Sequence, residues 1–301
     1  MKHAVIDVGS NTIRMVIYNV DGENLEEVAH ERDFAGLITY VTDEKLSDEG
    51  KKRIISTLNK MAEVCRQEEC ENICCFATAS LRNVKNIDGV LEEILNKTGI
   101  KMSIISGEDE ARYDFMGLLC EIDETSGIGF DLGGGSCQLF KFSKSKLDFF
   151  KSLKIGGQVI YKKFVSGDIP TKEEMHKIYD YIISELSSLS ELKDNNNQVI
   201  YAMGGAARNA AKYELITKDI TSSLKGFILS KERLVDICYK VTQTEDGKQS
   251  LIEIIPDRLT TLIPGIITII AILDFTGADK IKIVTNGVRE GFVYENIISK
   301  N

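Results

Sequence analysis

Two short segments carry residue types that suit phosphate binding, and they share one layout. The first reads Ile6-Asp7-Val8-Gly9-Ser10-Asn11-Thr12 and the second reads Phe130-Asp131-Leu132-Gly133-Gly134-Gly135-Ser136. Each joins two apolar runs, so each predicts a strand, a tight turn and a second strand. Glycine lets backbone N–H groups approach an anion closely, hydroxyls add donors, and each aspartate ends its strand where a hydrated cation could sit. The pair predicts two loops that bind one polyphosphate from opposite sides.

A single copy of this pattern would be weak evidence, because Asp-Gly is a common hairpin turn and an aspartate often caps its own turn. Two copies, 124 residues apart, favour the phosphate interpretation. We expect Asp7 and Asp131 to hold Mg²⁺ largely through water, since Mg²⁺ dehydrates reluctantly and prefers few carboxylates together with phosphate oxygens. Phosphate contacts are expected from Gly9, Ser10, Asn11, Gly133, Gly134, Gly135 and Ser136.

The elements expected after each loop follow a similar order. After the first loop we expect strands at 13–20 and 25–32, a helix at 47–69, and strands at 72–77 and 102–105. After the second we expect strands at 138–142 and 147–155, a helix at 172–192, and strands at 198–202 and 280–285. Hairpins followed by alternating strands and helices predict a mixed sheet flanked by helices. Because the series occurs twice, it predicts an α/β fold of two related lobes with a cleft between them, one formed by 1–124 plus 287–301 and the other by 125–286.

Four further segments carry motifs of a known family. Residues 77–86 match Ala-Thr-x-Ala-x-Arg-x-x-x-Asn, 106–111 look like Ser-Gly-x-Glu-Glu-Ala, 204–208 correspond to Gly-Gly-Thr-x-Arg, and 286–291 contain Gly-x-Arg-Glu-Gly. With the two loops, they make the chain resemble, nearly end to end, the exopolyphosphatase and guanosine pentaphosphate phosphohydrolase family (Ppx/GppA). The resemblance implies two ribonuclease-H-like lobes of the actin-like ATPase type and Mg²⁺-assisted hydrolysis of a terminal phosphoanhydride.

The resemblance also implies that Glu110 is the catalytic base, because the second acidic residue of the family motif falls on it. Two positions depart from the family: Asp109 replaces the first glutamate, and Ala206 replaces a threonine and so removes a hydroxyl. From position alone, the competing interpretation is that Glu108, Asp109 and Glu110 stabilise a helix N-terminus, an effect worth about 0.3–1 kcal/mol each.

Arginines near the motifs are candidates for binding the phosphate chain, because a planar guanidinium suits bidentate contacts to phosphate. Arg82 follows an expected strand end, and Asn86 one helical turn later could add a donor. Arg14 could instead be a solvated residue of an exposed strand face. The Gly204-Gly205 turn could present N–H groups to an anion or simply connect a strand to a helix. The full set of candidate arginines is Arg14, Arg82, Arg208, Arg258 and Arg289.

The composition of this 301-residue chain limits the classes of partner that it is expected to bind. A formal net charge of −9 indicates neither a nucleic acid polymer nor an anionic membrane as a partner. The apolar run at 262–273 is shorter than the roughly 20 residues needed to cross a bilayer, so it predicts a core helix. The seven cysteines have no zinc-type spacing, so we expect buried or half-buried thiols and a cytoplasmic protein. The sequence does not determine the oligomeric state, and a homodimer is one possible state.

The leading interpretation is an exopolyphosphatase that releases terminal orthophosphate from inorganic polyphosphate. Guanosine pentaphosphate is the alternative substrate, since both compounds end in a phosphoanhydride. A non-catalytic sensor of nucleotides would use the same loops, and a sugar or acetate kinase would share them but need an acceptor pocket. Retention of Glu110, Asp7 and Asp131 favours an enzyme over a sensor.

Overall fold

The structure is a computed structural model that describes residues 1–22, 24–193 and 198–299. It divides into two compact units, unit 1 (Met1–Gly117 with Val288–Asn301) and unit 2 (Leu118–Gly287). The sequence-based domain boundaries fall at 124 and 287, those of the compact units at 117 and 288. The cleft expected between the lobes stays a prediction.

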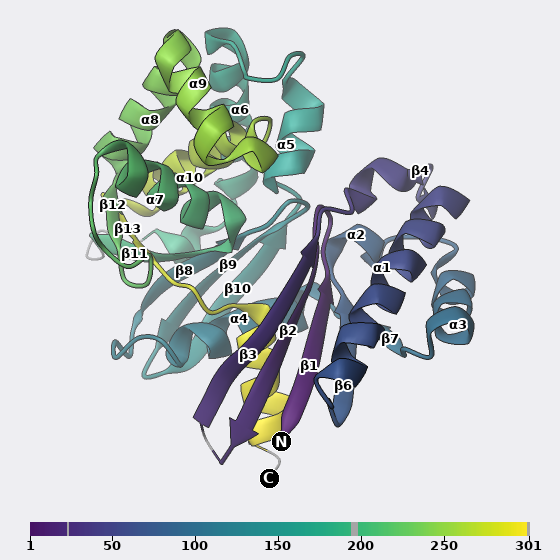
Figure 1. Ribbon diagram of the computed structural model, residues 1–301. Coiled ribbons are helices and arrows are strands. Elements are labelled where there is room, and N and C mark those ends of the chain that lie inside the picture. The colour runs from purple at the N-terminus through teal and green to yellow at the C-terminus, as the bar shows by residue number, and fades with distance from the viewer. Residues whose placement is uncertain (23, 194–197, 300–301) are drawn as a thin grey trace. The chain divides into compact units, whose positions relative to one another are not determined.

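Unit 1 contains two sheets and the helices beside them (Figure 1). Its strands are β1 (Lys2–Val8), β2 (Ile13–Asp21), β3 (Asn24–Asp33), β4 (Val41–Thr42), β5 (Lys45–Leu46), β6 (Asn72–Ala77) and β7 (Met102–Ile104). Its helices are α1 (Asp48–Gln67), α2 (Ala79–Arg82), α3 (Ile87–Thr98), α4 (Gly107–Leu119) and α11 (Val288–Val293).

Unit 2 contains one larger sheet and six α-helices among its described residues. Its strands are β8 (Gly127–Leu132), β9 (Cys137–Ser143), β10 (Lys146–Leu153), β11 (Val199–Met203), β12 (Ile228–Ser230) and β13 (Lys280–Ile283). Its helices are α5 (Gly157–Phe164), α6 (Lys172–Leu186), α7 (Gly204–Thr217), α8 (Lys231–Gln243), α9 (Glu245–Ile254) and α10 (Leu262–Thr276).

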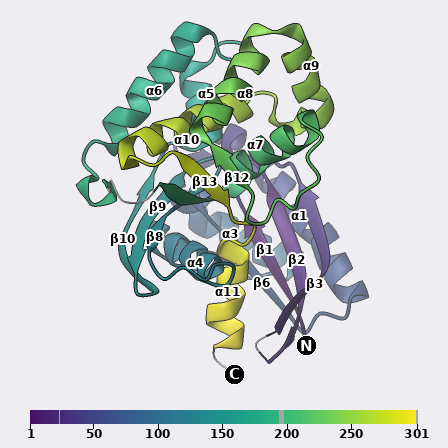
Figure 2. The same ribbon diagram turned by 90° about the vertical axis from the view of Figure 1, so that its left-hand side faces the viewer.

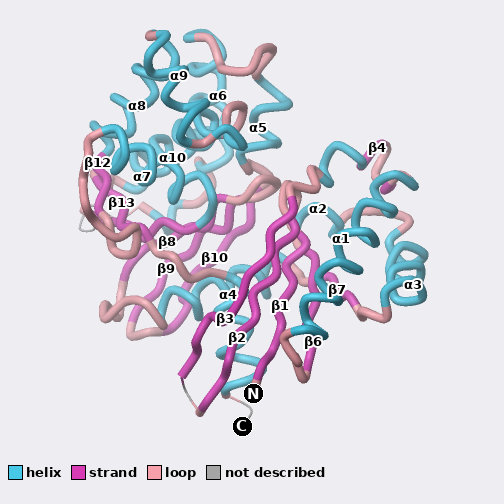
Figure 3. The backbone as a smooth tube through the Cα atoms, viewed as in Figure 1, coloured by secondary structure: helices cyan, strands magenta, loops and turns pink. Residues whose placement is uncertain are grey.

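The main sheets of both units are mixed, as predicted. In unit 1 the strand order is β3-β2-β1-β6-β7, with an antiparallel β1–β2–β3 meander and parallel β6 and β7 (Figure 3). In unit 2 the order is β10-β9-β8-β11-β13-β12, with the same antiparallel meander followed by parallel β11 and β13. The two-lobe repeat inferred from the sequence is therefore present as two sheets of related topology.

Helices cover both faces of the main sheet in unit 1. Alternate residues of a strand point to opposite faces of the sheet, so neighbouring residues of β1 pack against helices on different sides. Leu58 of α1 and Ile94 of α3 pack with Ile6 in one buried cluster. Tyr113 of α4 packs with Val5 in the other. The sheet is thus the middle layer, and its first strand contributes to two cores.

Helix α11 crosses α4 at Gly291. A Cβ atom at this position would lie 1.8 Å from the carbonyl oxygen of Tyr113 and 2.9 Å from the backbone nitrogen of Gly117. Only glycine allows two helix backbones to approach so closely. The contact holds the C-terminal motif at 286–291 beside α4.

In unit 2 the helices α5 to α10 pack on one face of the sheet (Figure 2). Helix α10 is buried nearly all round, which is typical of a core helix and confirms the prediction for 262–273. Pro264 falls in its first turn, where the missing N–H removes no helical hydrogen bond. Within the described ranges, we find no helix whose length and apolar character would suit a membrane span.

Several expected elements are longer in the prediction than in the structure, among them one helix and one strand of unit 2. The helix expected at 172–192 ends at Leu186, where Ser187 donates its hydroxyl to the Ser184 carbonyl, and a 3-10 turn (Ser190–Leu192) follows. The strand expected at 280–285 ends at Ile283, because the N–H groups of Thr285 and Asn286 bind the Glu121 carboxylate instead of a neighbouring strand.

All seven cysteines are free thiols. The expectation of buried or half-buried thiols is confirmed for six of them and wrong for Cys120, which is exposed just after α4 ends. Burial raises the pKa of the Cys65 thiol to about 12, so this thiol is protonated and unreactive at neutral pH.

Candidate functional site

Both phosphate loops are tight hairpins with the same internal geometry. Gly9 N donates to Thr12 O at 3.1 Å, and Gly133 N donates to Ser136 O at 3.0 Å. The aspartate of each loop lies in the first strand of its hairpin, opposite a polar residue of the second strand: Arg14 faces Asp7, and Gln138 faces Asp131. Each unit therefore carries its own copy of the loop.

In the first loop, neighbouring backbone holds the carbonyl oxygens. Ile38 N donates to Ser10 O at 3.0 Å, and Gly36 N donates to Asn11 O at 2.9 Å. No described residue accepts a hydrogen bond from the N–H of Ser10. A carbonyl that is bound elsewhere does not face an incoming anion, whereas a free N–H can.

The second loop is held in the same way by the start of α5. Gly157 N donates to Gly133 O at 3.0 Å, and Gln158 N donates to Gly134 O at 2.9 Å. The N–H groups of Gly134 and Gly135 have no acceptor in the parts of the chain that the structure describes. Both loops thus bind their carbonyls to protein and keep N–H groups for a ligand, which is the arrangement of an anion nest.

Glu110 and Arg82 meet in unit 1. Arg82 donates Nε to Ile105 O at 3.0 Å and Nη2 to the Glu110 carboxylate. Glu110 is 8% exposed, so its charge is largely removed from water and balanced by the guanidinium. The sequence predicted both residues for the site, and the structure joins them as an ion pair.

The neighbouring Asp109 has different partners. Its backbone N–H donates to Ser106 Oγ at 3.0 Å, and its carboxylate accepts from Arg112 and from the Ser106 hydroxyl, both at 2.8 Å. The Arg112 guanidinium, followed by the Ser106 hydroxyl, lowers the pKa of Asp109. These are the contacts of a helix N-terminus, so the helix-start interpretation applies to Asp109.

Arg289 lies in a buried polar group next to Asp7. Burial opposes its charge, but the nearby Glu290, Tyr18 and Asp7 raise the pKa of Arg289. Tyr18 donates its hydroxyl to the Glu290 carboxylate, and burial followed by Glu290 raises the pKa of Tyr18. Arg289 of the C-terminal motif thus feels the charge of the aspartate in the first loop. Sequence reasoning missed both residues: no local motif marks Tyr18, whereas Glu290 lies within the Gly-x-Arg-Glu-Gly motif at 286–291 but was not named as a site residue.

Gly204 leaves room for the Asp131 carboxylate in unit 2. A Cβ at Gly204 would lie 2.4 Å from Asp131 Oδ1 and 2.4 Å from Leu132 O, and the residue has φ +91°. Both the backbone angle and the close approach therefore require glycine. The first glycine of the predicted turn thus packs against the second loop.

We expect Gly204→Ala to lower the free energy of unfolding by about 2–5 kcal/mol, since it combines left-handed strain with overpacking. Gly226 is a matched control, because it has φ +75° and no atom within 4 Å of a Cβ. Gly226→Ala should cost only about 1–2 kcal/mol. Urea denaturation of both variants measures the difference, and equal losses would mean that the Asp131 contact is unimportant.

Other predicted residues have protein partners of their own. Arg208 Nη1 donates to Thr285 O at 3.1 Å. The Arg258 Nη2 atom lies 2.8 Å from where a Cβ of Gly205 would be, so the guanidinium covers the second glycine of the turn. Asn86 exchanges hydrogen bonds with both backbone groups of Leu46, so its amide holds that loop.

Two further residues were missed by sequence reasoning. Glu121 accepts hydrogen bonds from Thr285 N, Thr285 Oγ1 and Asn286 N at 2.8–3.0 Å, and no sequence signal marks it. Gln138 binds the Ser136 hydroxyl. The repeat could have indicated Gln138, because it stands in the second loop where Arg14 stands in the first.

The donor groups at hand fit Mg²⁺ better than zinc. Among the residues described, no three His, Cys, Asp or Glu side chains gather to form a metal site. Structural zinc needs four protein ligands, whereas Mg²⁺ uses one or two carboxylates with water and phosphate oxygens. Asp7 in unit 1 and Asp131 in unit 2 are carboxylates of that kind.

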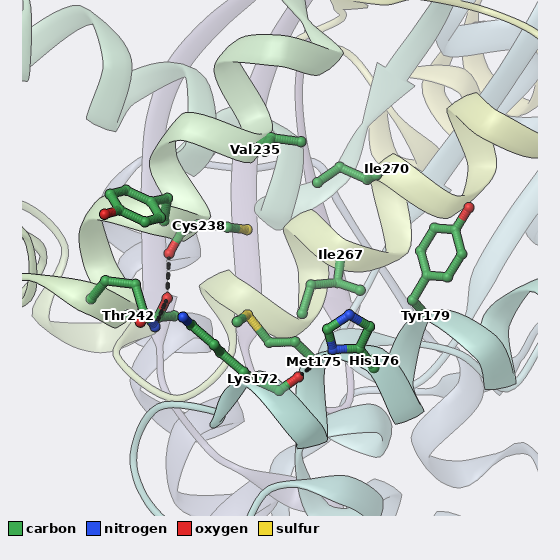
Figure 4. Close-up of a pocket in the computed structure, with 11 residues that line it drawn as sticks. Lys172, Met175, His176, Tyr179, Val235, Cys238, Thr242, Ile267 and Ile270 are labelled. Atoms are coloured by element: carbon green, nitrogen blue, oxygen red, sulfur yellow. Dashed lines mark hydrogen bonds between the residues drawn. The ribbon is translucent and has the colours of Figure 1, made fainter.

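A separate pocket in unit 2 has different chemistry. It holds about 330 Å³ between α6, α8 and α10, and its apolar wall includes Met175, Val235, Cys238, Ile267 and Ile270 (Figure 4). None of the predicted phosphate-binding residues lines it. Lys172, His176 and Thr242 also line this pocket, but most of its wall is apolar, so it does not suit a polyanionic substrate.

Comparison with known proteins identifies similar chains. The chain is 27% identical to the bifunctional 3-dehydroquinate synthase/phosphatase of Fusobacterium nucleatum, over 99% of this chain and 47% of that protein. It is 21% identical to exopolyphosphatase 1 of Mycobacterium tuberculosis, over 100% and 89%. It is 26% identical to the guanosine-5′-triphosphate,3′-diphosphate pyrophosphatase of Pseudoalteromonas translucida, over 97% and 58%. The chain thus spans only about half the length of the first and third relatives.

The fold is also that of a solved structure. The crystal structure of the Aquifex aeolicus member of the Ppx/GppA family superposes with a TM-score of 0.81 at 21% identity, and covers 100% of this chain and 99% of that one. The model of the Ppx/GppA phosphatase family matches residues 16–300. Loops, motifs, topology and family match agree, and the chain belongs to the Ppx/GppA phosphatase family.

Proposed function

We propose that this protein is an exopolyphosphatase that releases terminal orthophosphate from inorganic polyphosphate. The observation that carries the proposal is the shared construction of the two loops. Each binds its carbonyls to neighbouring backbone and keeps N–H groups for an anion. Two such loops suit a substrate that carries a negative charge on every phosphate.

Glu110 is the proposed base, which orients or deprotonates the attacking water. Arg82 holds the Glu110 carboxylate through Nη2 and the Ile105 carbonyl through Nε. A guanidinium has five N–H donors, so others remain for phosphoryl oxygens. Arg82 thereby links the position of the base to that of the phosphate, which is the alignment that phosphoryl transfer needs.

Asp7 and Asp131 are the residues proposed to hold Mg²⁺, which would neutralise charge on the phosphate oxygens when bound. Arg289 is proposed to add positive charge beside Asp7. The negative net charge of the chain makes these local cations necessary for attracting a polyanion. Free thiols throughout the chain support a reducing compartment, for which we propose the cytoplasm.

Guanosine pentaphosphate is the second candidate substrate, since relatives named guanosine-5′-triphosphate,3′-diphosphate pyrophosphatase match over 97% of this chain. Polyphosphate is preferred because every phosphate of that substrate carries a charge that the free N–H groups of the two loops can bind.

Parallel phosphate-release assays with long-chain polyphosphate, tripolyphosphate and guanosine pentaphosphate test the choice of substrate. We expect kcat/KM for long-chain polyphosphate to exceed that for guanosine pentaphosphate by at least about tenfold, or ~1.4 kcal/mol in transition-state binding. The reverse order would make guanosine pentaphosphate the substrate. Binding of all three without phosphate release would indicate a sensor.

A further inference from the structure

Gln138 is a buried side chain that binds the hydroxyl group of the second phosphate loop. Its Nε2 donates to Ser136 Oγ at 2.8 Å and to Ser152 Oγ at 3.2 Å. Gln138 is 1% exposed and Ser136 is 5% exposed. Water therefore has little access to either group, and the protein itself determines how this hydroxyl is oriented.

The strand register explains why Gln138 is in this place. On β9 it lies directly opposite Asp131 of β8 on one side and Ser152 of β10 on the other. Residues opposite each other in neighbouring strands point to the same face of a sheet. Gln138 therefore lies in one row with the aspartate of the loop, one strand away from it.

The hydrogen bond determines what the Ser136 hydroxyl can do. A hydroxyl has one proton to donate and two lone pairs that accept. When the Gln138 N–H occupies a lone pair of Ser136 Oγ, the Ser136 proton remains available to a different acceptor. Accepting a hydrogen bond also polarises the hydroxyl and makes it a better donor.

The first loop has no such arrangement. Thr12 occupies the position of Ser136 in the repeat, and its buried Oγ1 has no hydrogen-bond partner among the residues that the structure describes. Arg14 occupies the position of Gln138. The two loops are therefore alike in backbone but differ in how their hydroxyl is held.

We propose that Gln138 is a positioning residue that directs the Ser136 hydroxyl proton towards a phosphoryl oxygen. In this arrangement the Ser136 hydroxyl of the second loop is preoriented by a neighbouring side chain, unlike the Thr12 hydroxyl at the equivalent position of the first loop. The inference rests on the proposed function, because it takes residues 133–136 to bind phosphate. It adds a residue that was not among the site residues predicted from the sequence.

A double-mutant cycle tests the inference in the full chain. The variants are Ser136→Ala, Gln138→Met and their combination, and the probe is tripolyphosphate, with binding measured by calorimetry and KM and kcat by phosphate release. We expect Ser136→Ala to weaken binding about tenfold, as for loss of a hydrogen bond to a charged group, and Gln138→Met about three- to tenfold. The combined variant should bind no more weakly than Ser136→Ala.

Ser152→Ala is the matched control, because it removes the other acceptor of the Gln138 amide and leaves Ser136 intact. It should bind tripolyphosphate like the unmodified protein. Thermal melting of each variant separates binding losses from unfolding, and Gln138→Leu repeats the test with a second apolar side chain. A merely structural Gln138 would lower the melting temperature without coupling to Ser136.

The outcomes distinguish this inference from the proposed function. Additive losses in the combined variant, or tighter binding by Gln138→Met, would overturn the positioning role while phosphate binding by the loop stands. Unchanged binding by Ser136→Ala would also overturn the inference, but it leaves the backbone N–H groups on which the proposed function rests. Failure of the unmodified protein to bind tripolyphosphate would contradict the proposed function itself.

Discussion

Replacing Glu110 with glutamine is expected to lower phosphate release from polyphosphate by about 10²–10⁴-fold, the usual contribution of a general base. Glutamine keeps the size and most hydrogen bonding of the side chain but removes the negative charge that orients or deprotonates water. Glu110 is 8% exposed and its carboxylate is bound by Arg82, whereas the neighbouring Asp109 binds Ser106 and Arg112. Initial rates with long-chain polyphosphate at saturating concentration measure the loss.

Binding of polyphosphate should survive Glu110→Gln and even become tighter, because removal of an anion beside a polyanionic ligand relieves like-charge repulsion. Calorimetry with the variant separates this result from a folding defect. If Glu110 only stabilised the start of α4, the variant would lose a few tenths of a kcal/mol in stability and keep its turnover.

Asp109→Asn is the matched control, since it makes the same chemical change one residue earlier. Asp109 binds Ser106 and Arg112 at the helix start and makes no contact with Arg82 that the structure shows. Turnover should stay within about twofold, because a surface ion pair is worth about 0–1 kcal/mol. If Asp109 proved critical and Glu110 did not, the family motif would have been aligned one residue out of register.

Removal of divalent cation is expected to abolish phosphate release, and Asp131→Asn should have nearly the same effect in the presence of Mg²⁺. A metal that neutralises phosphoryl oxygens contributes several kcal/mol to the transition state, which corresponds to about 10²-fold or more in rate. The measurements are turnover after EDTA treatment, turnover after Mg²⁺ is restored, and Mg²⁺ binding to the substrate-free variant by calorimetry.

Asp148→Asn controls for the change from aspartate to asparagine, because Asp148 is an exposed residue of β10 in the same sheet. It should leave both Mg²⁺ binding and turnover unchanged. Full turnover in EDTA would remove the metal from the proposed mechanism. Asp131→Asn must also melt like the unmodified protein, since Asp131 packs against Gly204 and a loss of fold would explain the loss of turnover in another way.

The loops and the apolar helix were predictable because their causes are local. Aspartate, glycine and serine within seven residues specify a tight turn, and the structure shows the turn hydrogen bond in both copies. An apolar run that is hydrophobic all round must be buried, whatever it packs against, and α10 is buried. The repeat then predicted two α/β units, because the same order of elements produces the same sheet twice.

Partners far apart in the chain were decided only by the tertiary structure. Arg208 was a candidate for phosphate, yet one of its donors binds the carbonyl of Thr285, two residues after β13 ends. In the sheet, β13 lies beside β11. Helix α7, which contains Arg208, starts directly after β11. Spacing along the chain contains no information about which backbone carbonyl will lie within reach of a long side chain.

The sequence by itself determined which residues could bind phosphate or its metal ion, because glycine and arginine suit phosphate, and aspartate suits Mg²⁺, in any fold. Only the tertiary structure decided how they are grouped. Strands β1, β6 and β7 pair in parallel, so the end of β6, which precedes Arg82, and the end of β7, which precedes α4, lie at the same edge of the sheet. At this edge Arg82 meets Glu110. The same holds for Gln138, whose role depends on a cross-strand register that brings Asp131 and Ser152 to either side of it. The physical reason is that a side chain acts over a few ångströms, and sheet pairing determines which residues come that close.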